Sequence, residues 1–169
     1  LFLLRKMIAS KTVEERKAAL NELFPFAKED IKKTLAAMDG YPVTIRTLDP
    51  PLHEFVPQNA EERQKLAESL GITNEEFNKR ADALHENNPM MGHRGVRLGT
   101  TYPEVTEMQV RAILESAVEL TQAGIKVSPE IMVPVVSTEK ELDHQKVIVD
   151  RIYKEVCAKY NVKAIKYMY

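Results

Sequence analysis

Hydrophobic positions follow helix-like and strand-like patterns in turn along the chain. Residues 13–23 and 26–38 place apolar side chains three to four positions apart, which predicts two helices separated at Pro25. A Thr-Val-Glu-Glu sequence at residues 12–15 is typical of a helix start. Residues 42–48 are rich in β-branched side chains and predict a strand.

The second half of the chain continues the alternation. Residues 92–99 are short and punctuated by glycine, which predicts a strand with its loop. A long helix is expected to begin with a cap at Thr101 and to end at Gly124. The apolar residues 130–136 predict a strand that is buried on both faces. Another capping sequence starts a helix over residues 138–160, and residues 162–169 predict a further strand.

The order of these elements predicts parallel strands joined by helices, because strands alternate with helical crossovers. An open doubly wound sheet and a β/α barrel both fit. Residues 49–88 differ, since they open with two prolines and carry two polar helical patterns, and we interpret them as a helical insertion. No glycine-rich phosphate-binding sequence follows a strand, which disfavours a nucleotide-binding open sheet. A complete barrel needs about 250 residues, so the barrel alternative makes this chain part of one.

Composition narrows the classes of function. The 169 residues include 24 basic and 25 acidic side chains, a balance that argues against a general nucleic-acid binder. No apolar run approaches the roughly 20 residues that a membrane span needs. One cysteine, Cys157, excludes an internal disulfide and suggests a reducing compartment. The chain begins without Met and ends within a predicted strand, so we expect a fragment.

Arginines are the main candidates for chemistry. Arg46 lies near the carboxyl end of a predicted strand, where α/β folds place their active sites, and its guanidinium suits a carboxylate or phosphate. The spacing alone equally allows a structural ion pair with Asp49. Arg94 and Arg97 lie among glycines and are candidates for the same anion site, although an ordinary surface position is the commoner outcome.

Metal binding and thiol chemistry have weaker support. Cys157 lies on a predicted helix, where a packed cysteine is more common than a reactive one. The possible metal ligands match no known zinc or calcium spacing; they are Asp49, His53, Glu54, His85, Glu86 and His93.

Several motifs resemble the pyruvate phosphate dikinase family, in family order and over nearly the whole chain. They are residues 42–55 (PVTIRTLDPPLHEF), 88–98 (NPMMGHRGVRL), 101–104 (TYPE) and 129–136 (PEIMVPVV). The resemblance implies that residues 1–169 form part of the pyruvate/phosphoenolpyruvate-binding domain, with a helical insertion at about 50–90. The expected fold is a partial (β/α)8 TIM barrel, roughly strands 2 to 5.

The resemblance also implies a role for two side chains. Arg46 and Arg94 match family arginines that hold the transferring phosphoryl group, and neither Arg97 nor His93 is assigned such a role. The intact enzyme converts ATP, pyruvate and phosphate into AMP, phosphoenolpyruvate and diphosphate. It uses Mg²⁺, whose ligands are expected outside this chain.

The expected partners are the phosphohistidine and ATP-binding domains of a longer chain that forms a homodimer in the cytoplasm, without nucleic acid or membrane. The isolated chain is expected to be inactive. The alternatives are a fragment of phosphoenolpyruvate synthase or of enzyme I of the phosphotransferase system, and a non-catalytic half-barrel interaction module.

Overall fold

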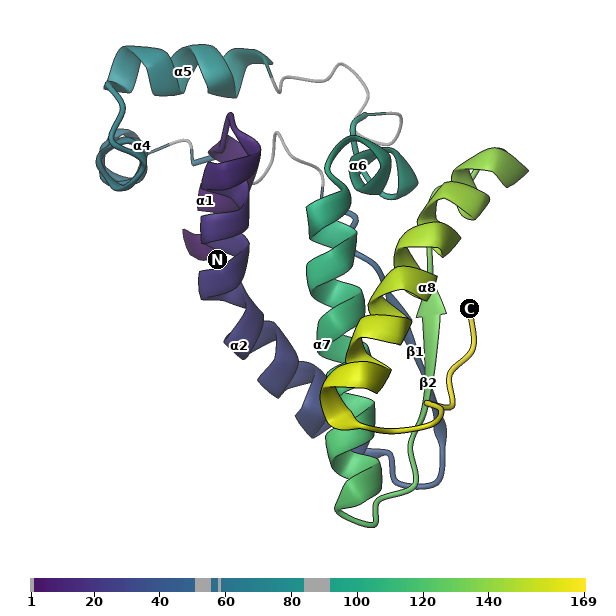
Figure 1. The fold of residues 1–169 in the computed structure, drawn as a ribbon. Helices are drawn as coiled ribbons and strands as arrows, with labels where there is room; N and C mark the ends of the chain where they lie inside the picture. The colour runs from purple at the N-terminus through teal and green to yellow at the C-terminus, as the bar shows by residue number, and fades with distance from the viewer. Residues whose placement is uncertain (1, 51–55, 58, 84–91) are drawn as a thin grey trace. The chain divides into compact units, whose positions relative to one another are not determined.

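The computed structural model describes residues 2–50, 56–57, 59–83 and 92–169, which belong to two compact units (Figure 1). Unit 1 comprises Leu1–Leu23 and Pro50–Arg94. Unit 2 comprises Phe24–Asp49 and Gly95–Tyr169. Each unit has its own hydrophobic core, so each is described by itself.

The regular elements of unit 1 that the structure describes are all helices. Its helices are α1 (Phe2–Ala9), the beginning of α2 (Val13–Ala37), α4 (Ala60–Leu70) and α5 (Asn74–Ala83). The side chain of Asn59 caps α4 by accepting the N–H of Glu61 at 2.9 Å. The core residues come from three of these helices and the segment before α4; they are Ala9, Val56, Leu66, Ala67 and Phe77. The prediction of two helices within the polar segment 49–88 is confirmed.

Helix α2 is continuous across Pro25, so the prediction of two separate helices is wrong. A proline inside a helix removes one backbone N–H and crowds the preceding turn. Here the helix continues on both sides, with Leu20 buried before the proline and Leu35 buried after it.

Unit 2 contains the sheet. Its elements after α2 are β1 (Pro42–Arg46), α6 (Val96–Thr101), α7 (Pro103–Gln122), β2 (Ser128–Met132) and α8 (Glu139–Tyr160). The two strands are parallel, and Pro42 pairs with Ser128 while Arg46 pairs with Met132. The fold of the described residues is therefore mixed α/β, with a two-stranded parallel sheet.

One face of the sheet packs against the helices. Ile45 and Ile131 point to this face and contact the core that α7 and α8 form. Figure 1 shows these two helices beside the strands. On the opposite face Thr44 Oγ1 donates to a carboxylate oxygen of Glu130 at 2.6 Å, and Met132 is exposed. The expectation of a strand buried on both faces over residues 130–136 is therefore wrong for this sheet.

The predicted strand over residues 92–99 is also wrong, because α6 begins at Val96. Gly95 has φ 57° and ψ −131°, a conformation that turns the chain immediately before the helix. Short apolar runs fit a strand and a buried helix equally well by periodicity, so the pattern could not separate the two.

The last two predicted strands are shorter than expected. β2 ends at Met132 because Pro134 lacks an N–H, and Val135 has φ 61°. The segment 162–169 contributes one parallel bridge, in which Ile131 N–H donates to Met168 O at 2.8 Å.

The two long helices of the second half of the chain begin in different ways. The Thr138 capping box of α8 is confirmed, since Glu141 and Thr138 exchange side-chain and backbone hydrogen bonds. The cap at Thr101 is wrong, because Thr101 Oγ1 donates to Arg97 O within α6 and α7 begins at Pro103. A proline in the first turn needs no N–H partner, so α7 starts without a side-chain cap.

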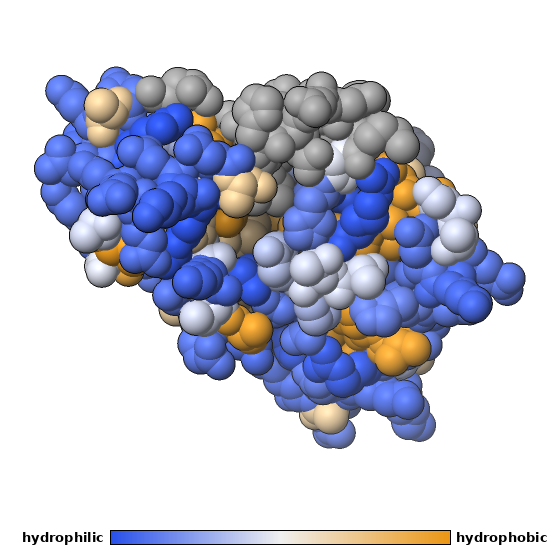
Figure 2. All heavy atoms as spheres, turned by 90° about the horizontal axis from the view of Figure 1, so that it is seen from above, coloured by the Kyte–Doolittle hydropathy of each residue, from blue (hydrophilic) through white to orange (hydrophobic). Residues whose placement is uncertain are grey.

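The face of the molecule drawn in Figure 2 is mostly hydrophilic, with small separate hydrophobic patches. Among the helices that the structure describes, none is both long enough and apolar enough to span a membrane.

Candidate functional site

Arg46 is the last residue of β1 and lies at the carboxyl edge of the sheet. Its side chain is 56% exposed, so the guanidinium is accessible to a ligand. The carboxylate of Asp49 is only 4% exposed, and its Oδ2 lies 3.8 Å from Arg46 Nη1. The two alternatives that the sequence left open are therefore compatible, since the arginine has a carboxylate neighbour and still faces solvent.

The backbone after Arg46 is fixed by the buried side chain of Gln109 on α7. Gln109 Nε2 donates to Arg46 O at 3.0 Å, and Leu48 N–H donates to Gln109 Oε1 at 2.7 Å. Between these two bonds, Thr47 N–H donates to Met132 O at 2.9 Å. Each of three consecutive residues at the strand end thus has a backbone polar group held by a hydrogen bond from outside its own segment.

Arg94 is partly buried and belongs to unit 1, whereas Arg46 belongs to unit 2. Its backbone N–H donates to Gly92 O at 3.0 Å. The peptide bond joins Arg94 to Gly95, the first residue of its segment in unit 2. A shared anion site formed by Arg46 and Arg94 stays a prediction.

Gly95 lies against the loop that follows β2. A Cβ atom at this position would come 2.8 Å from Pro134 O and 3.0 Å from a methyl group of Val135. The adjacent Val96 N–H donates to the same Pro134 O at 3.0 Å. We expected this glycine to allow close approach to a ligand, and its close approach is instead to the protein's own backbone.

The other residues considered from the sequence add no further site. His93 and Arg97 are partly buried and each has an interaction within the protein, and Cys157 is partly buried on α8. Residues 51–55 and 84–91, which include His53 and His85, lie outside the described residues. Within the described part of the chain, no three His, Cys, Asp or Glu side chains gather as metal ligands would.

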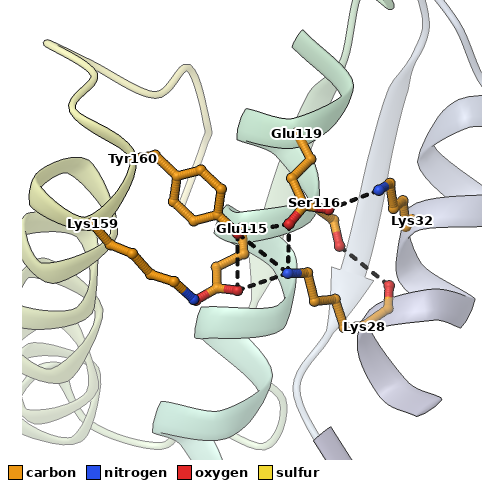
Figure 3. Close-up of polar contacts among 7 residues, drawn as sticks. All are labelled: Lys28, Lys32, Glu115, Ser116, Glu119, Lys159 and Tyr160. Carbon is orange, nitrogen blue, oxygen red and sulfur yellow. Dashed lines mark hydrogen bonds and ion pairs between the residues drawn. The ribbon is translucent and has the colours of Figure 1, made fainter. Parts of the chain in front are cut away.

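A second polar cluster joins α2, α7 and α8 in unit 2 (Figure 3). The Glu115 side chain is 1% exposed and accepts from Lys28 Nζ at 2.8 Å and Lys159 Nζ at 2.6 Å. Glu119 accepts from Lys28 and Lys32, each at 2.7 Å. Because each carboxylate is paired with two lysines, the cluster is a structural network between three helices.

The network favours the charged forms of its two carboxylates and the neutral form of its tyrosine. Burial by itself would raise the pKa of Glu119, but hydrogen bonds from Lys28, Lys32 and Tyr160 outweigh burial and lower it to about 2. The same competition, with Lys159 and Lys28 as donors, lowers the pKa of Glu115. Burial and the carboxylates together raise the pKa of Tyr160 to about 12.

Acid is therefore expected to weaken unit 2. A carboxylate whose pKa is lowered on folding stabilises the protein above its unfolded pKa, near 4.5, and this stabilisation is lost as the pH falls towards 2. In urea titrations between pH 6 and 2, Glu119→Gln should flatten the fall in the free energy of unfolding. Glu29→Gln is the control, because Glu29 is exposed and its carboxylate lies 3.3 Å from Lys33. An unchanged pH profile in Glu119→Gln would contradict the network's role.

Gln109 is the site residue that the sequence analysis missed. A signal was present, because Gln109 lies four residues from both Val105 and Ile113, within the buried surface of α7. A polar side chain at such a position needs a hydrogen-bond partner. The pattern could not show that the partner is the backbone of β1.

Comparisons with known proteins place the chain in a family. The family described as "PEP-utilising enzyme, PEP-binding domain" (PEP is phosphoenolpyruvate) matches residues 2–169. Pyruvate, phosphate dikinase of Clostridium symbiosum is 51% identical over 154 residues, which are 90% of this chain and 18% of that protein.

Relatives from other organisms agree. Pyruvate, phosphate dikinase 1, chloroplastic, of Arabidopsis thaliana is 49% identical over 91% of this chain and 16% of its own length. Pyruvate, phosphate dikinase of Giardia intestinalis is 48% identical over 90% of this chain and 17% of its own length. The chain spans less than a fifth of each of these relatives. The resemblance predicted from its motifs is confirmed, and the chain belongs to the family of PEP-binding domains of PEP-utilising enzymes.

Proposed function

We propose that this chain is a segment of a pyruvate phosphate dikinase and supplies Arg46 and Arg94 as ligands of the transferring phosphoryl group. The whole protein would convert ATP, pyruvate and phosphate into AMP, phosphoenolpyruvate and diphosphate, and the isolated chain would be inactive. The observation that carries the proposal is the exposed guanidinium of Arg46 at the carboxyl edge of β1, in a chain of the PEP-binding family.

The chemistry of phosphoryl transfer suits such an arginine. Negative charge spreads over the phosphoryl oxygens during transfer, and catalysis consists mainly of positioning and electrostatic stabilisation. A guanidinium keeps its charge at all physiological pH values and offers a planar pair of donors to two oxygens. Asp49 restrains the side chain from one side while more than half of it remains exposed.

We propose further that residues 1–169 are part of a PEP-binding (β/α)8 barrel, roughly strands 2 to 5, with a helical insertion at about 50–90. Two features support this placement. Helix α7 lies between the parallel strands β1 and β2 in the sequence, and the chain returns after α8 to form a second parallel pairing, of Met168 with Glu130. Helices α4 and α5 fall within the proposed insertion.

The described residues of this segment do not fit Mg²⁺, which the family resemblance implies. The residues that the structure describes bring no three potential metal ligands together, so we assign no step to a metal here. We propose that this segment contributes the cationic contacts to the phosphoryl group. The metal ligands would come from other parts of the longer protein.

The proposed partners are pyruvate and phosphoenolpyruvate, together with the phosphohistidine and ATP-binding domains of the same longer chain. A homodimer in the cytoplasm is the expected assembly and location, with no role for nucleic acid or membrane. The near balance of 24 basic and 25 acidic side chains supports the absence of a nucleic-acid partner.

The proposal is tested by measuring which cosubstrates the full-length protein that contains this chain requires. We expect pyruvate formation from phosphoenolpyruvate to require both AMP and diphosphate, and to yield ATP and phosphate in equal amounts with pyruvate. In the opposite direction, phosphoenolpyruvate formation from ATP and pyruvate should require phosphate. Formation without added phosphate, with water as the second acceptor, would identify a phosphoenolpyruvate synthase instead.

A further inference from the structure

We infer that Gln109 is a positioning residue for Arg46, and that α7 sets through Gln109 where the guanidinium meets the phosphoryl group. The inference rests on the proposed function of Arg46. Gln109 lies on a helix that is remote in sequence from β1, and it would act on the ligand only through the end of that strand.

The geometry gives Gln109 two contacts that flank one residue. Its Nε2 donates to Arg46 O at 3.0 Å, and its Oε1 accepts from Leu48 N–H at 2.7 Å. A primary amide provides a donor and an acceptor on neighbouring atoms, so one side chain satisfies both backbone groups. Aliphatic replacements provide neither group, and a carboxylate provides the acceptor without the donor.

These contacts lie where the regular sheet ends. Pairing between β1 and β2 stops at Arg46 and Met132, and one further bond joins Thr47 N–H to Met132 O. Beyond this point the backbone turns towards Asp49, whose carboxylate lies 3.8 Å from the Arg46 guanidinium. Gln109 therefore fixes the short segment that carries both the arginine and its acidic neighbour.

The Gln109 side chain is largely shielded from water, since Gln109 is 9% exposed and lies on the packed surface of α7. Without its amide, the Arg46 carbonyl and the Leu48 N–H would lose the partners that hold them in place, and the segment would shift to regain hydrogen bonds with other groups or with water. A displacement of about 1 Å at a ligand-binding group can reduce turnover by 10²-fold.

Gln109→Met in the full-length protein is the test, because methionine nearly preserves the volume and removes both hydrogen bonds. We expect kcat/KM for phosphoenolpyruvate to fall by about 30-fold. Ser116→Ala is the matched control, since Ser116 is another buried α7 side chain that donates to a backbone carbonyl, that of Lys28 at 3.2 Å. This control should leave kcat/KM within twofold of the wild type.

A double-mutant cycle separates positioning from a general loss of structure. If Gln109 acts through Arg46, Gln109→Met should change turnover by less than twofold when Arg46 is already alanine. Full additivity of the two losses would overturn the inference. An unimpaired Arg46→Ala protein would refute the proposed function itself, whereas an impaired Arg46→Ala with an unimpaired Gln109→Met would refute only the positioning role.

Gln109→Glu provides a second variant if the methionine variant fails to fold. Its carboxylate keeps the acceptor for Leu48 N–H and removes the donor to Arg46 O. We expect hydrogen exchange of the Leu48 amide to stay slow in Gln109→Glu, while kcat/KM still falls at least tenfold. Wild-type turnover in this folded variant would overturn the inference.

Discussion

Arg46→Ala in the full-length protein is expected to lower phosphoenolpyruvate-dependent pyruvate formation by about 10³-fold, the scale on which single charge-stabilising donors act in phosphoryl and acyl transfer. The exposed guanidinium of Arg46 lies at the carboxyl edge of β1, where no other β1 side chain carries a charge. The reaction of ATP at the proposed ATP-binding domain should proceed at its normal rate. Steady-state assays of both reactions on the same protein preparation measure the difference.

Two variants sharpen this experiment. Arg46→Lys keeps the charge but loses the planar pair of donors, so we expect a loss intermediate between those of the wild type and the alanine variant. Arg111→Ala removes an arginine that pairs with Glu155 on the surface between α7 and α8, and should leave turnover within twofold of normal. Equal turnover in Arg46→Ala and Arg111→Ala would contradict the role of Arg46.

Gly95→Ala is expected to destabilise unit 2 by about 3 kcal/mol, since a side chain in this rarely populated φ/ψ region costs about 1–3 kcal/mol and a crowded Cβ adds a comparable amount. The added Cβ would lie 2.8 Å from Pro134 O, and φ is 57°. Urea unfolding of the 169-residue chain measures the loss of free energy. In the full-length protein the same change should also impair turnover, because Arg94 is the preceding residue.

Gly40→Ala is the matched control for this substitution. Gly40 has φ 84°, but a Cβ there would meet no atom within 4 Å. Its loss of unfolding free energy should therefore be about 1 kcal/mol, from conformation alone. If both alanine variants lose the same free energy, the contact of Gly95 with the loop after β2 does not contribute to stability.

The elements with local signals could be predicted from the sequence. The capping box at Thr138 marks the start of α8, and the β-branched residues before Arg46 mark β1. Both signals depend on interactions within a few residues, so a single sequence contains them.

Other features depend on contacts between distant segments. Gly95 contacts Pro134, which lies nearly forty residues later in the sequence. The local pattern of residues 92–99 does not contain this contact, and it therefore predicted a strand. The side chain of Gln109 likewise bonds to the backbone of Arg46 and Leu48, more than sixty residues earlier in the chain. No local pattern in the sequence contains these contacts.

The candidate site was predictable only in part. The position of Arg46 at a strand end followed from the pattern of residues 42–48, and the structure confirms it. The spacing of Arg46 and Asp49 suggested an ion pair as an alternative to ligand binding, and the structure has the two groups 3.8 Å apart with the arginine still exposed. The assignment of a phosphoryl ligand depended on the family motifs, because the geometry shows an accessible guanidinium but does not show what binds it.

The most direct test of the central claim is a structure of the full-length protein with phosphoenolpyruvate bound. We expect a guanidinium nitrogen of Arg46 to lie about 2.7–3.2 Å from a phosphate oxygen, the range of a direct hydrogen bond. We also expect the ligand to lie at the carboxyl edge of β1 and β2. Phosphoenolpyruvate bound at another place, with no contact to Arg46, would contradict this role of Arg46.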